Sequence, residues 1–193
     1  MKRLTRILII TAFGAFVSCG GGGTDPDPIS EGWGFFSSGQ LFEAHTSFVT
    51  AVESGKNEGY IGLGWVCIDL DSLPESDRYF GIVSGDSLSD GYAGWSAVLW
   101  ARANYAGCIT KSDFVLRHEP NYQFTHRPAV NFQDLQWYQA SSYLHQGNYS
   151  QCLLKIQQLD NNFTTDTNAA NAGDVLAAKL ELLAGQLKKH IIQ

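Results

Sequence analysis

The sequence lacks the short motifs by which most enzymes and cofactor-binding proteins are identified. It contains no Gly-x-Ser-x-Gly, no His-Glu-x-x-His, no phosphate-binding loop and no dinucleotide fingerprint. Each of these motifs supplies a fixed geometry for a nucleophile, a metal or a phosphate. We therefore expect a protein that is not an enzyme and that holds no cofactor. The carboxylates are scattered along the chain, and we interpret them as solvated surface charge.

Cysteine is scarce and irregularly spaced. The chain has four, at Cys19, Cys67, Cys108 and Cys152, and no Cys-x-x-Cys pair. This spacing excludes the usual zinc and thiol-redox motifs, and we expect no metal site. The preferred interpretation of the last three is that they are small buried hydrophobic residues. In an exported protein, a disulfide between two of them, with one thiol left over, is the alternative.

Basic residues are outnumbered by acidic ones. The chain has 13 Lys and Arg against 19 Asp and Glu, and a formal net charge of −6. Removal of the N-terminal segment described below takes away Lys2, Arg3 and Arg6 and leaves 10 basic against 19 acidic side chains, a charge of −9. Nucleic acids and anionic lipid surfaces are disfavoured partners, because affinity for phosphate groups depends on basic contacts.

The N-terminus resembles the signal of a bacterial lipoprotein. An apolar run from Ile7 to Val17 follows a basic start and is too short to span a bilayer, which is typical of a secretory signal. The run ends in Phe16-Val17-Ser18-Cys19, which resembles the lipobox, where the signal is removed before a cysteine that becomes diacylated. We predict a signal peptide at residues 1–18 and lipidation of Cys19, with acyl chains such as palmitate as the membrane anchor.

A flexible tether, residues 19–28, follows the predicted cleavage site. Its glycines and two Asp-Pro steps disfavour helix. In lipoprotein sorting as described for enteric bacteria, an aspartate directly after the lipidated cysteine retains the protein at the inner membrane. Gly20 stands at that place, so the chain resembles the outer-membrane class, with the side of exposure left open. An ordinary secretory signal with an incidental cysteine is the alternative.

An internal repeat organises residues 31–80. Apolar and small residues three or four apart share one helical face, and a repeat of about 30 to 40 residues is typical of a solenoid. The pattern therefore predicts that each unit consists of a helix, a tight turn and a second helix. A weaker copy begins at Gly94 and Trp95, and a partial one at Trp137. The first two copies are Gly32, Trp33, Gly39, Leu41, Ala44, Phe48, Ala51 and Gly64, Trp65, Asp71, Leu73, Ser76, Phe80, Val83.

This pattern resembles the tetratricopeptide repeat (TPR), a pair of antiparallel helices with small residues where they cross. The resemblance implies an all-α fold over residues 29–193, a right-handed α-solenoid of TPR-like helical hairpins. The positions that match, in family order, are Gly32, Gly64 and Ala140; Phe35, Cys67 and Tyr143; Ala44, Ser76 and Cys152; Phe48, Phe80 and Ile156; Ala51, Val83 and Leu159. Asp71 departs from the pattern at the turn glycine, and residues 90–116 do not fall into its register.

Three further segments complete the predicted fold. Helices are expected at residues 91–106 and 109–117, and a final helix starts at Asp174. This helix has an apolar stripe on one face, which suits a C-terminal capping helix whose other face is exposed to solvent. The stripe consists of Leu176, Leu180, Leu183 and Leu187.

Residues 118–130 form the one long irregular segment, because Pro120 and Pro128 prevent a helix. His118, Glu119 and His126 within it are candidate metal ligands. The preferred interpretation is that these histidines are surface residues in a connection. An enzyme built on this segment is the last of three functional hypotheses.

Tryptophans are the sharpest candidates for binding. In the family, the positions of Trp33, Trp65 and Trp137 would line the concave groove, with Phe36 and Ile68 beside them. Rigid aromatic rings there would bind a peptide or a partner helix. The competing interpretation, slightly preferred because tryptophan is usually highly buried, is that these rings fill the core.

The first functional hypothesis is a membrane-anchored adaptor that holds protein partners in the bacterial cell envelope. The second is a glycan- or small-ligand-binding accessory lipoprotein in nutrient uptake, since tryptophan rings stack on sugars.

Overall fold

The computed structural model describes residues 26–83 and 89–187 of the 193-residue chain. The predicted signal peptide, Cys19 and nearly all of the tether lie outside these residues. Every regular element in the described part is an α-helix: α1 (Pro28–Ser37), α2 (Leu41–Glu53), α3 (Glu58–Asp69), α4 (Leu73–Ile82), α5 (Ser89–Ala101), α6 (Tyr105–His118), α7 (Phe132–His145), α8 (Tyr149–Leu159) and α9 (Ala172–Gln186).

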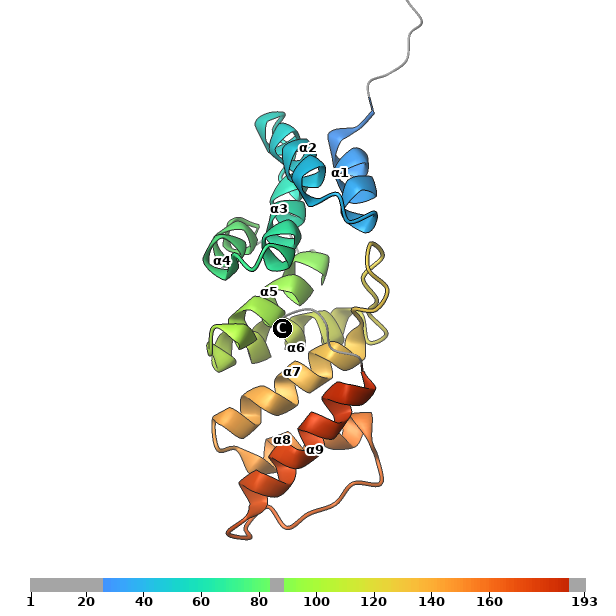
Figure 1. Ribbon diagram of the computed structural model, residues 1–193. Coiled ribbons are helices and arrows are strands. Elements are labelled where there is room, and N and C mark those ends of the chain that lie inside the picture. The colour runs from blue at the N-terminus through green and yellow to red at the C-terminus, as the bar shows by residue number, and fades with distance from the viewer. Residues whose placement is uncertain (1–25, 84–88, 188–193) are drawn as a thin grey trace, which may run out of the picture.

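The helices α1 to α8 pair as consecutive hairpins that stack along one axis, with α9 packed across α7 and α8 at the C-terminal end (Figure 1). Each first helix also contacts the first helix of the next hairpin, from α1 to α3, α3 to α5 and α5 to α7. The predicted all-α solenoid with a capping helix is therefore confirmed.

Residues in the left-handed conformation mark the turn inside each hairpin. Gly39, Asp71, Ala103 and Gly147 have φ values of 76°, 55°, 58° and 71°. The first three are 32 residues apart, and Gly147 follows Ala103 by 44. Glycine reaches this conformation freely, whereas aspartate and alanine meet a steric penalty at Cβ. The repeat is thus 32 residues long, and 12 extra residues between α6 and α7 account for the longer last interval.

The third hairpin corrects two predicted helix boundaries. The helix expected at 91–106 ends at Ala101, and the helix expected from residue 109 already begins at Tyr105. Ala103 turns the chain, and the Asn104 side chain accepts a hydrogen bond of 3.1 Å from the backbone N–H of Gly107, which caps α6. The prediction was wrong because alanine, the best helix former, carries no turn signal.

With the 32-residue period, the third hairpin falls into the family register. The weaker copy that the sequence suggested at Gly94 and Trp95 is displaced by two residues, since Gly32 and Gly64 are followed at the same interval by Ser96. The positions of the third hairpin that match the family pattern are Ser96, Leu99, Cys108, Ser112 and Val115, all buried.

Glycines allow phenylalanine rings to lie directly against the first helices. The ring of Phe48 lies between Gly32 of α1 and Gly62 of α3, where an added Cβ would come within 2.6 Å and 2.4 Å of ring atoms. Interiors are packed too densely to leave room for that extra carbon. The same arrangement recurs one repeat later with Phe80, Gly64 and Gly94.

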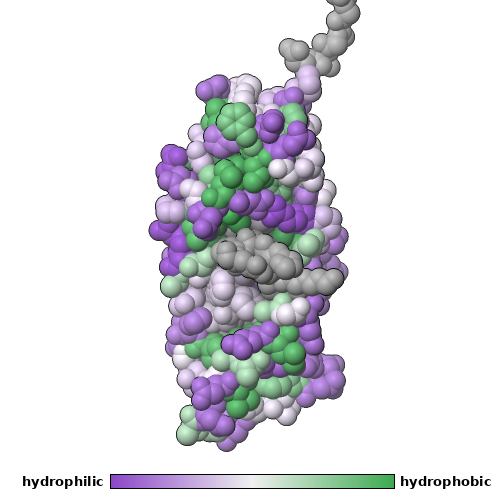
Figure 2. All heavy atoms as spheres, viewed as in Figure 1, coloured by the Kyte–Doolittle hydropathy of each residue, from purple (hydrophilic) through white to green (hydrophobic). Residues whose placement is uncertain are grey.

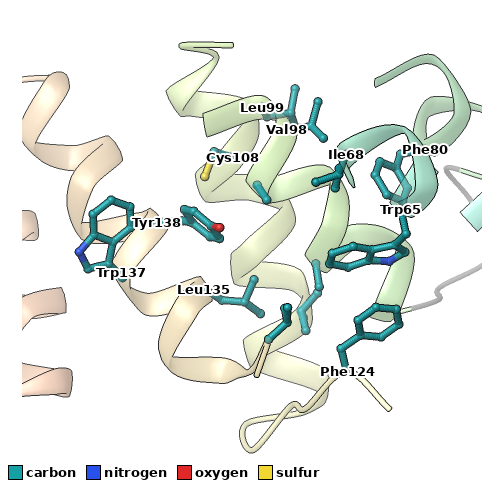
Figure 3. Close-up of a cluster of buried hydrophobic side chains, with 14 of the residues drawn as sticks. Trp65, Ile68, Phe80, Val98, Leu99, Cys108, Phe124, Leu135, Trp137 and Tyr138 are labelled. Carbon is teal, nitrogen blue, oxygen red and sulfur yellow. The ribbon is translucent and has the colours of Figure 1, made fainter. Parts of the chain in front are cut away.

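The junction between the third and fourth hairpins is filled differently. The positions equivalent to glycine, phenylalanine and glycine hold Ser96, Ser112 and Tyr138, and all three side chains are buried. The large residue is thus supplied by α7 instead of by the second helix of the preceding hairpin. Figure 3 shows the Tyr138 ring reaching from α7 toward Cys108 on α6.

The cap helix α9 covers the end of the last hairpin. Leu176, Leu180 and Leu183 are buried, as the predicted stripe requires. The indole Nε1 of Trp137 donates a hydrogen bond of 3.0 Å to the carbonyl oxygen of Leu180, which gives the buried indole its polar partner. Cap and last hairpin therefore share one core.

The cysteines at 67, 108 and 152 are free thiols buried in the core, which is the preferred interpretation of the sequence. Burial raises the pKa of the Cys108 and Cys152 thiols to about 12. Thiolate character, which reactive cysteines need, is therefore suppressed at both positions.

Candidate functional site

Four of the five predicted groove residues are buried. The exposed fractions of Phe36, Trp65, Ile68 and Trp137 are 2%, 0%, 5% and 9%, so these side chains contact the core. Only Trp33 is half-buried. This distribution agrees with the preferred interpretation that the rings fill the core, and it leaves Trp33 as the residue of the set with substantial exposed surface.

Trp137 also occupies a different repeat position from the other two tryptophans. Counted with the 32-residue period and the insertion, the residue equivalent to Trp33 and Trp65 is Ser141, which is buried. Trp137 lies one helical turn earlier, at the position of Ile61. A row of three tryptophans along one groove is therefore not formed, because their positions in the repeat differ.

The connection between α6 and α7, residues 119–131, is called the insertion below. It folds back along the first helices α1 and α3 (Figure 1). Phe124 at its centre is fully buried, stacked on Trp65 with ring centroids 4.3 Å apart and edge-on to Trp33 at 5.6 Å. Figure 3 shows the Phe124 ring beside the Trp65 indole. The chain thus covers with its own residues the face on which the sequence predicted a groove.

Polar contacts hold the insertion in place. Arg127 forms a two-pronged ion pair with Asp69 of α3, and its guanidinium lies over the Phe36 ring at 4.6 Å. Within the insertion, the Phe124 N–H donates to the Val130 carbonyl at 2.9 Å, and the N–H of Phe132, the first residue of α7, donates to the Tyr122 carbonyl at 2.7 Å. Because Tyr122, Phe124 and Val130 are buried, the insertion is part of the core.

The two histidines of the predicted metal segment lie in separate aromatic contacts. The His118 ring stacks on Phe114 at 4.1 Å, whereas the His126 ring lies parallel to Trp33 at 4.1 Å with an interplanar angle of 1°. Glu119 accepts a hydrogen bond from the Ser89 hydroxyl. Among the described residues, no group of three or more His, Cys, Asp or Glu side chains is arranged to hold a metal ion.

A cavity of about 390 Å³ remains between the insertion and the first helices. We call it the insertion cavity. Buried or half-buried residues form its floor, and exposed polar residues of the insertion and of α3 form its rim. Its lining residues are Trp33, Glu58, Ile61, Ser89, Asp90, Glu119, Gln123 and Thr125.

The environment of the insertion cavity changes the pKa of Asp90. Burial raises the pKa of Asp90, the hydrogen bond from Tyr122 and the nearby His126 lower it, and the charge of Glu119 raises it further. The net direction is upward, because burial disfavours the charged form. A positive charge beside Asp90 would therefore stabilise its ionised form.

A second cavity, of about 320 Å³, lies at the N-terminal end between α1 and α2. Phe42 lines it and is 81% exposed, more than any other large apolar side chain in the described part of the chain. On the face seen in Figure 2, apolar residues gather over α3 and over α8 and α9, and hydrophilic residues cover most of the edges. Of the described helices, none is long and apolar enough to cross a membrane.

Comparison with known proteins supports the fold. No protein-family model matches the chain, and no curated protein matches it. The chain is similar to the crystal structure of a tetratricopeptide repeat protein from Parabacteroides merdae ATCC 43184, with a TM-score of 0.56 and 14% sequence identity. The match covers 82% of this chain and 59% of that one, so the chain spans less than two thirds of its neighbour's length. At this identity, the likeness shows the TPR-like fold alone.

Sequence reasoning missed the residues that shape the insertion cavity. No sequence motif marks Asp90, and Tyr122 and Phe124 lie in the segment that was expected to be an irregular connection. The available signal was the pair of large aromatic residues two apart in an otherwise polar segment. Alternating aromatic residues are typical of an extended segment with one buried face.

Proposed function

We propose that this protein is a membrane-anchored lipoprotein of the bacterial cell envelope that acts as an adaptor for a protein partner. The observation that carries the proposal is the insertion cavity, a concave site with converging polar groups on a helical-repeat scaffold. The absence of standard catalytic motifs in the sequence and the resemblance to tetratricopeptide repeats support binding over catalysis.

The partner would contact the mouth of the insertion cavity. Opening the whole first-helix face would expose Phe124, Trp65 and Phe36, which are buried together. Burying one large aromatic side chain stabilises by roughly 1.5 to 3 kcal/mol, so an incoming peptide would have to replace several such contacts. The exposed rim residues Gln123 and Thr125 are accessible without that cost.

Glycan binding, the second hypothesis, is less well supported by the aromatic contacts. A sugar ring needs an exposed aromatic face, but Trp65 is fully buried against Phe124, and Trp137 is buried with its ring 5.1 Å from Trp100. One face of Trp33 is stacked on His126. Saturable binding of an oligosaccharide to the folded protein on a glycan array would reverse this preference.

Photo-crosslinking in native membranes tests the adaptor role. A photoreactive amino acid at Gln123, on the cavity rim, is expected to capture a distinct protein. The matched control places it at Leu182, which is 56% exposed on α9. Capture of the same proteins at both sites, or of none at Gln123, would contradict the proposal.

The anchor is tested separately. Metabolic labelling with palmitate is expected to label the wild-type chain and not Cys19→Ser, which should also leave the membrane fraction. Equal labelling of both chains would refute lipidation at Cys19. Fractionation of inner and outer membranes then tests the proposed location in the outer membrane, which rests on Gly20 after the cysteine.

A further inference from the structure

The insertion cavity has an unbalanced charge. Glu58 of α3, Asp90 of α5 and Glu119 of the insertion line it, and none of the described side chains in its lining is basic. The remaining lining groups are an indole, an aliphatic side chain and neutral polar side chains. The three carboxylates come from three different elements, so the fold itself brings them together.

Three basic side chains that stand within two residues of lining residues in the sequence make contacts of their own. Arg127 of the insertion is paired with Asp69, and Lys56, two residues before Glu58, is paired with Asp27. His126 stacks on Trp33, and burial lowers its pKa against the raising effect of Asp90. None of these three side chains lines the cavity.

Asp90 is held rigidly at the floor. Its carbonyl oxygen accepts a hydrogen bond of 3.1 Å from Nε1 of Trp65, and its carboxylate Oδ1 accepts one of 2.9 Å from the Tyr122 hydroxyl. Both donors are buried aromatic residues, and Trp65 also stacks on Phe124. A carboxylate positioned in advance pays little ordering entropy when a ligand binds.

The chemistry of the lining selects the class of ligand. An anion would be repelled by three carboxylates, and an apolar group would cover them without giving them partners. A cation would pair with the carboxylates, and the half-buried Trp33, one face of which is stacked on His126, would form an aromatic wall beside it. A volume of about 390 Å³ admits a lysine or arginine side chain with its hydrocarbon stem.

We propose that the insertion cavity binds the ammonium or guanidinium group of a basic side chain presented by the protein partner. This inference rests on the proposed adaptor function and names the chemistry of the partner's anchoring residue. Electrostatic attraction to the acidic rim would also accelerate the encounter.

The binding test uses the folded chain and small probes. N-acetyl-arginine amide and N-acetyl-lysine amide are titrated while the indole N–H signal of Trp33 is followed by NMR. The matched neutral probe is N-acetyl-citrulline amide, which has nearly the shape of the arginine probe without its charge. Saturable shifts are expected with the two cations only and should weaken when salt is raised, because charge pairs near the surface are screened. Equal shifts with citrulline would overturn the proposal.

Matched variants locate the effect. Glu58→Gln with Glu119→Gln is expected to weaken binding of the cationic probes at least about tenfold, since two of the three carboxylate charges of the lining are removed. Glu43→Gln with Glu181→Gln changes the net charge equally at two exposed positions outside the insertion cavity and should leave affinity within about twofold. A similar loss in both double variants would show that only net charge matters, which would overturn the proposal.

Crosslinking from Gln123 separates this inference from the adaptor function. If the wild type captures a partner, Glu58→Gln with Glu119→Gln should abolish capture, and excess N-acetyl-arginine amide should compete. Undiminished capture in that variant overturns the inference and keeps the adaptor function. The third outcome is that the cations bind saturably but no protein is captured. In that case the cavity is a cation site, the cation does not come from a protein partner, and the adaptor function is refuted.

Discussion

The first two junctions between repeats and the third fill the same space with opposite partners. Phe48 and Phe80 each lie between two glycines, one from their own hairpin and one from the next. At the third junction the second-helix position holds Ser112, and the large ring is Tyr138 from the following hairpin. The comparison teaches that the register of the solenoid sets where volume is needed, while either neighbour can supply it.

The junction at which the large ring comes from the other hairpin, between α6 and α7, is also the place in the chain where the insertion occurs. The first two hairpins have the insertion over α1 and α3, where Phe124 stacks on Trp65. The last hairpin has α9 instead, where Leu180 lies against Trp137. In both regions an added element packs on a buried tryptophan: the insertion stacks Phe124 on the Trp65 ring, and α9 accepts the hydrogen bond of the Trp137 indole N–H. Such elements are needed because stacked hairpins leave apolar surface uncovered.

The largest effect is expected from removing the ring at the centre of the insertion. Phe124→Ala should lower the free energy of unfolding by about 3 to 5 kcal/mol, because it leaves a cavity against Trp65 and Trp33. Urea unfolding followed by tryptophan fluorescence measures this loss. Phe42→Ala, at an exposed position of the first hairpin, should change stability by no more than about 0.5 kcal/mol. A small loss for Phe124→Ala would mean that the packing of the insertion against α1 and α3 contributes little to stability.

The glycine-phenylalanine packing is tested by adding one methyl group. Gly62→Ala places a Cβ about 2.4 Å from the Phe48 ring and should destabilise by about 1 to 3 kcal/mol. Gly34→Ala, in the neighbouring helix α1, meets nothing within 4 Å and should stabilise by about 0.5 to 1 kcal/mol, because alanine loses less backbone entropy. Equal midpoints of urea unfolding for the two variants would contradict the close approach.

The third junction is tested by exchanging its partners. Ser112→Phe alone should destabilise by about 1 to 3 kcal/mol, because Tyr138 already fills the space. Combining it with Tyr138→Gly restores the phenylalanine and the following glycine of the first two junctions, with Ser96 kept at the other glycine position, and should be less destabilising than the sum of the single changes by about 1 kcal/mol. A double-mutant cycle in urea measures the coupling. Simple additivity would show that the two positions do not share one space.

A smaller effect is expected at the turn of the third hairpin. Ala103 has a φ of 58°, so Ala103→Gly should stabilise by about 1 kcal/mol by relieving Cβ strain. Gly147→Ala, at the equivalent turn of the last hairpin, should destabilise by a similar amount. Opposite shifts in melting temperature are expected, and shifts of the same sign would contradict the left-handed assignment.

The smallest expected effect concerns pH. Burial lowers the pKa of His126 in the fold against the raising effect of Asp90, so the unfolded chain binds the proton more tightly. The stability contributed by neutral His126 is therefore present above pH 6.5 and is lost as pH falls below it. His126→Phe keeps an aromatic ring beside Trp33 and should lose less stability between pH 7.5 and 5.5. An identical pH profile for both chains would exclude this contribution.

Much of the fold could be predicted because it depends on local spacing. The apolar positions of α1 to α4 and of α7 to α9 recur at three and four residues, and the matches at Gly32, Gly64 and Ala140 follow the family pattern. The third hairpin was harder, because Ala103 replaces a turn glycine and Ser112 replaces the packing phenylalanine. Its register becomes visible only when the turn conformations give the period.

The site was much less predictable. Trp33, Trp65, Phe36 and Ile68 were correctly placed on first helices. Their exposure, however, depends on a segment that lies 59 residues after Trp65 and 91 residues after Trp33 at its contact residue Phe124. Spacing within a helix cannot say whether a distant loop will cover that face. Glu119 was a candidate metal ligand, whereas Glu58 and Asp90 became candidates only once the fold brought all three carboxylates to one cavity.

The amino-acid sequence alone determined the helical class, the hairpin repeat and the small positions at helix crossings, because these follow from periodicity and side-chain size within a few turns of chain. The tertiary structure alone decided that the first-helix face is closed by the insertion and that three carboxylates share one cavity. Those features arise from contacts between residues far apart in the chain, where packing and charge act through space and leave no local pattern.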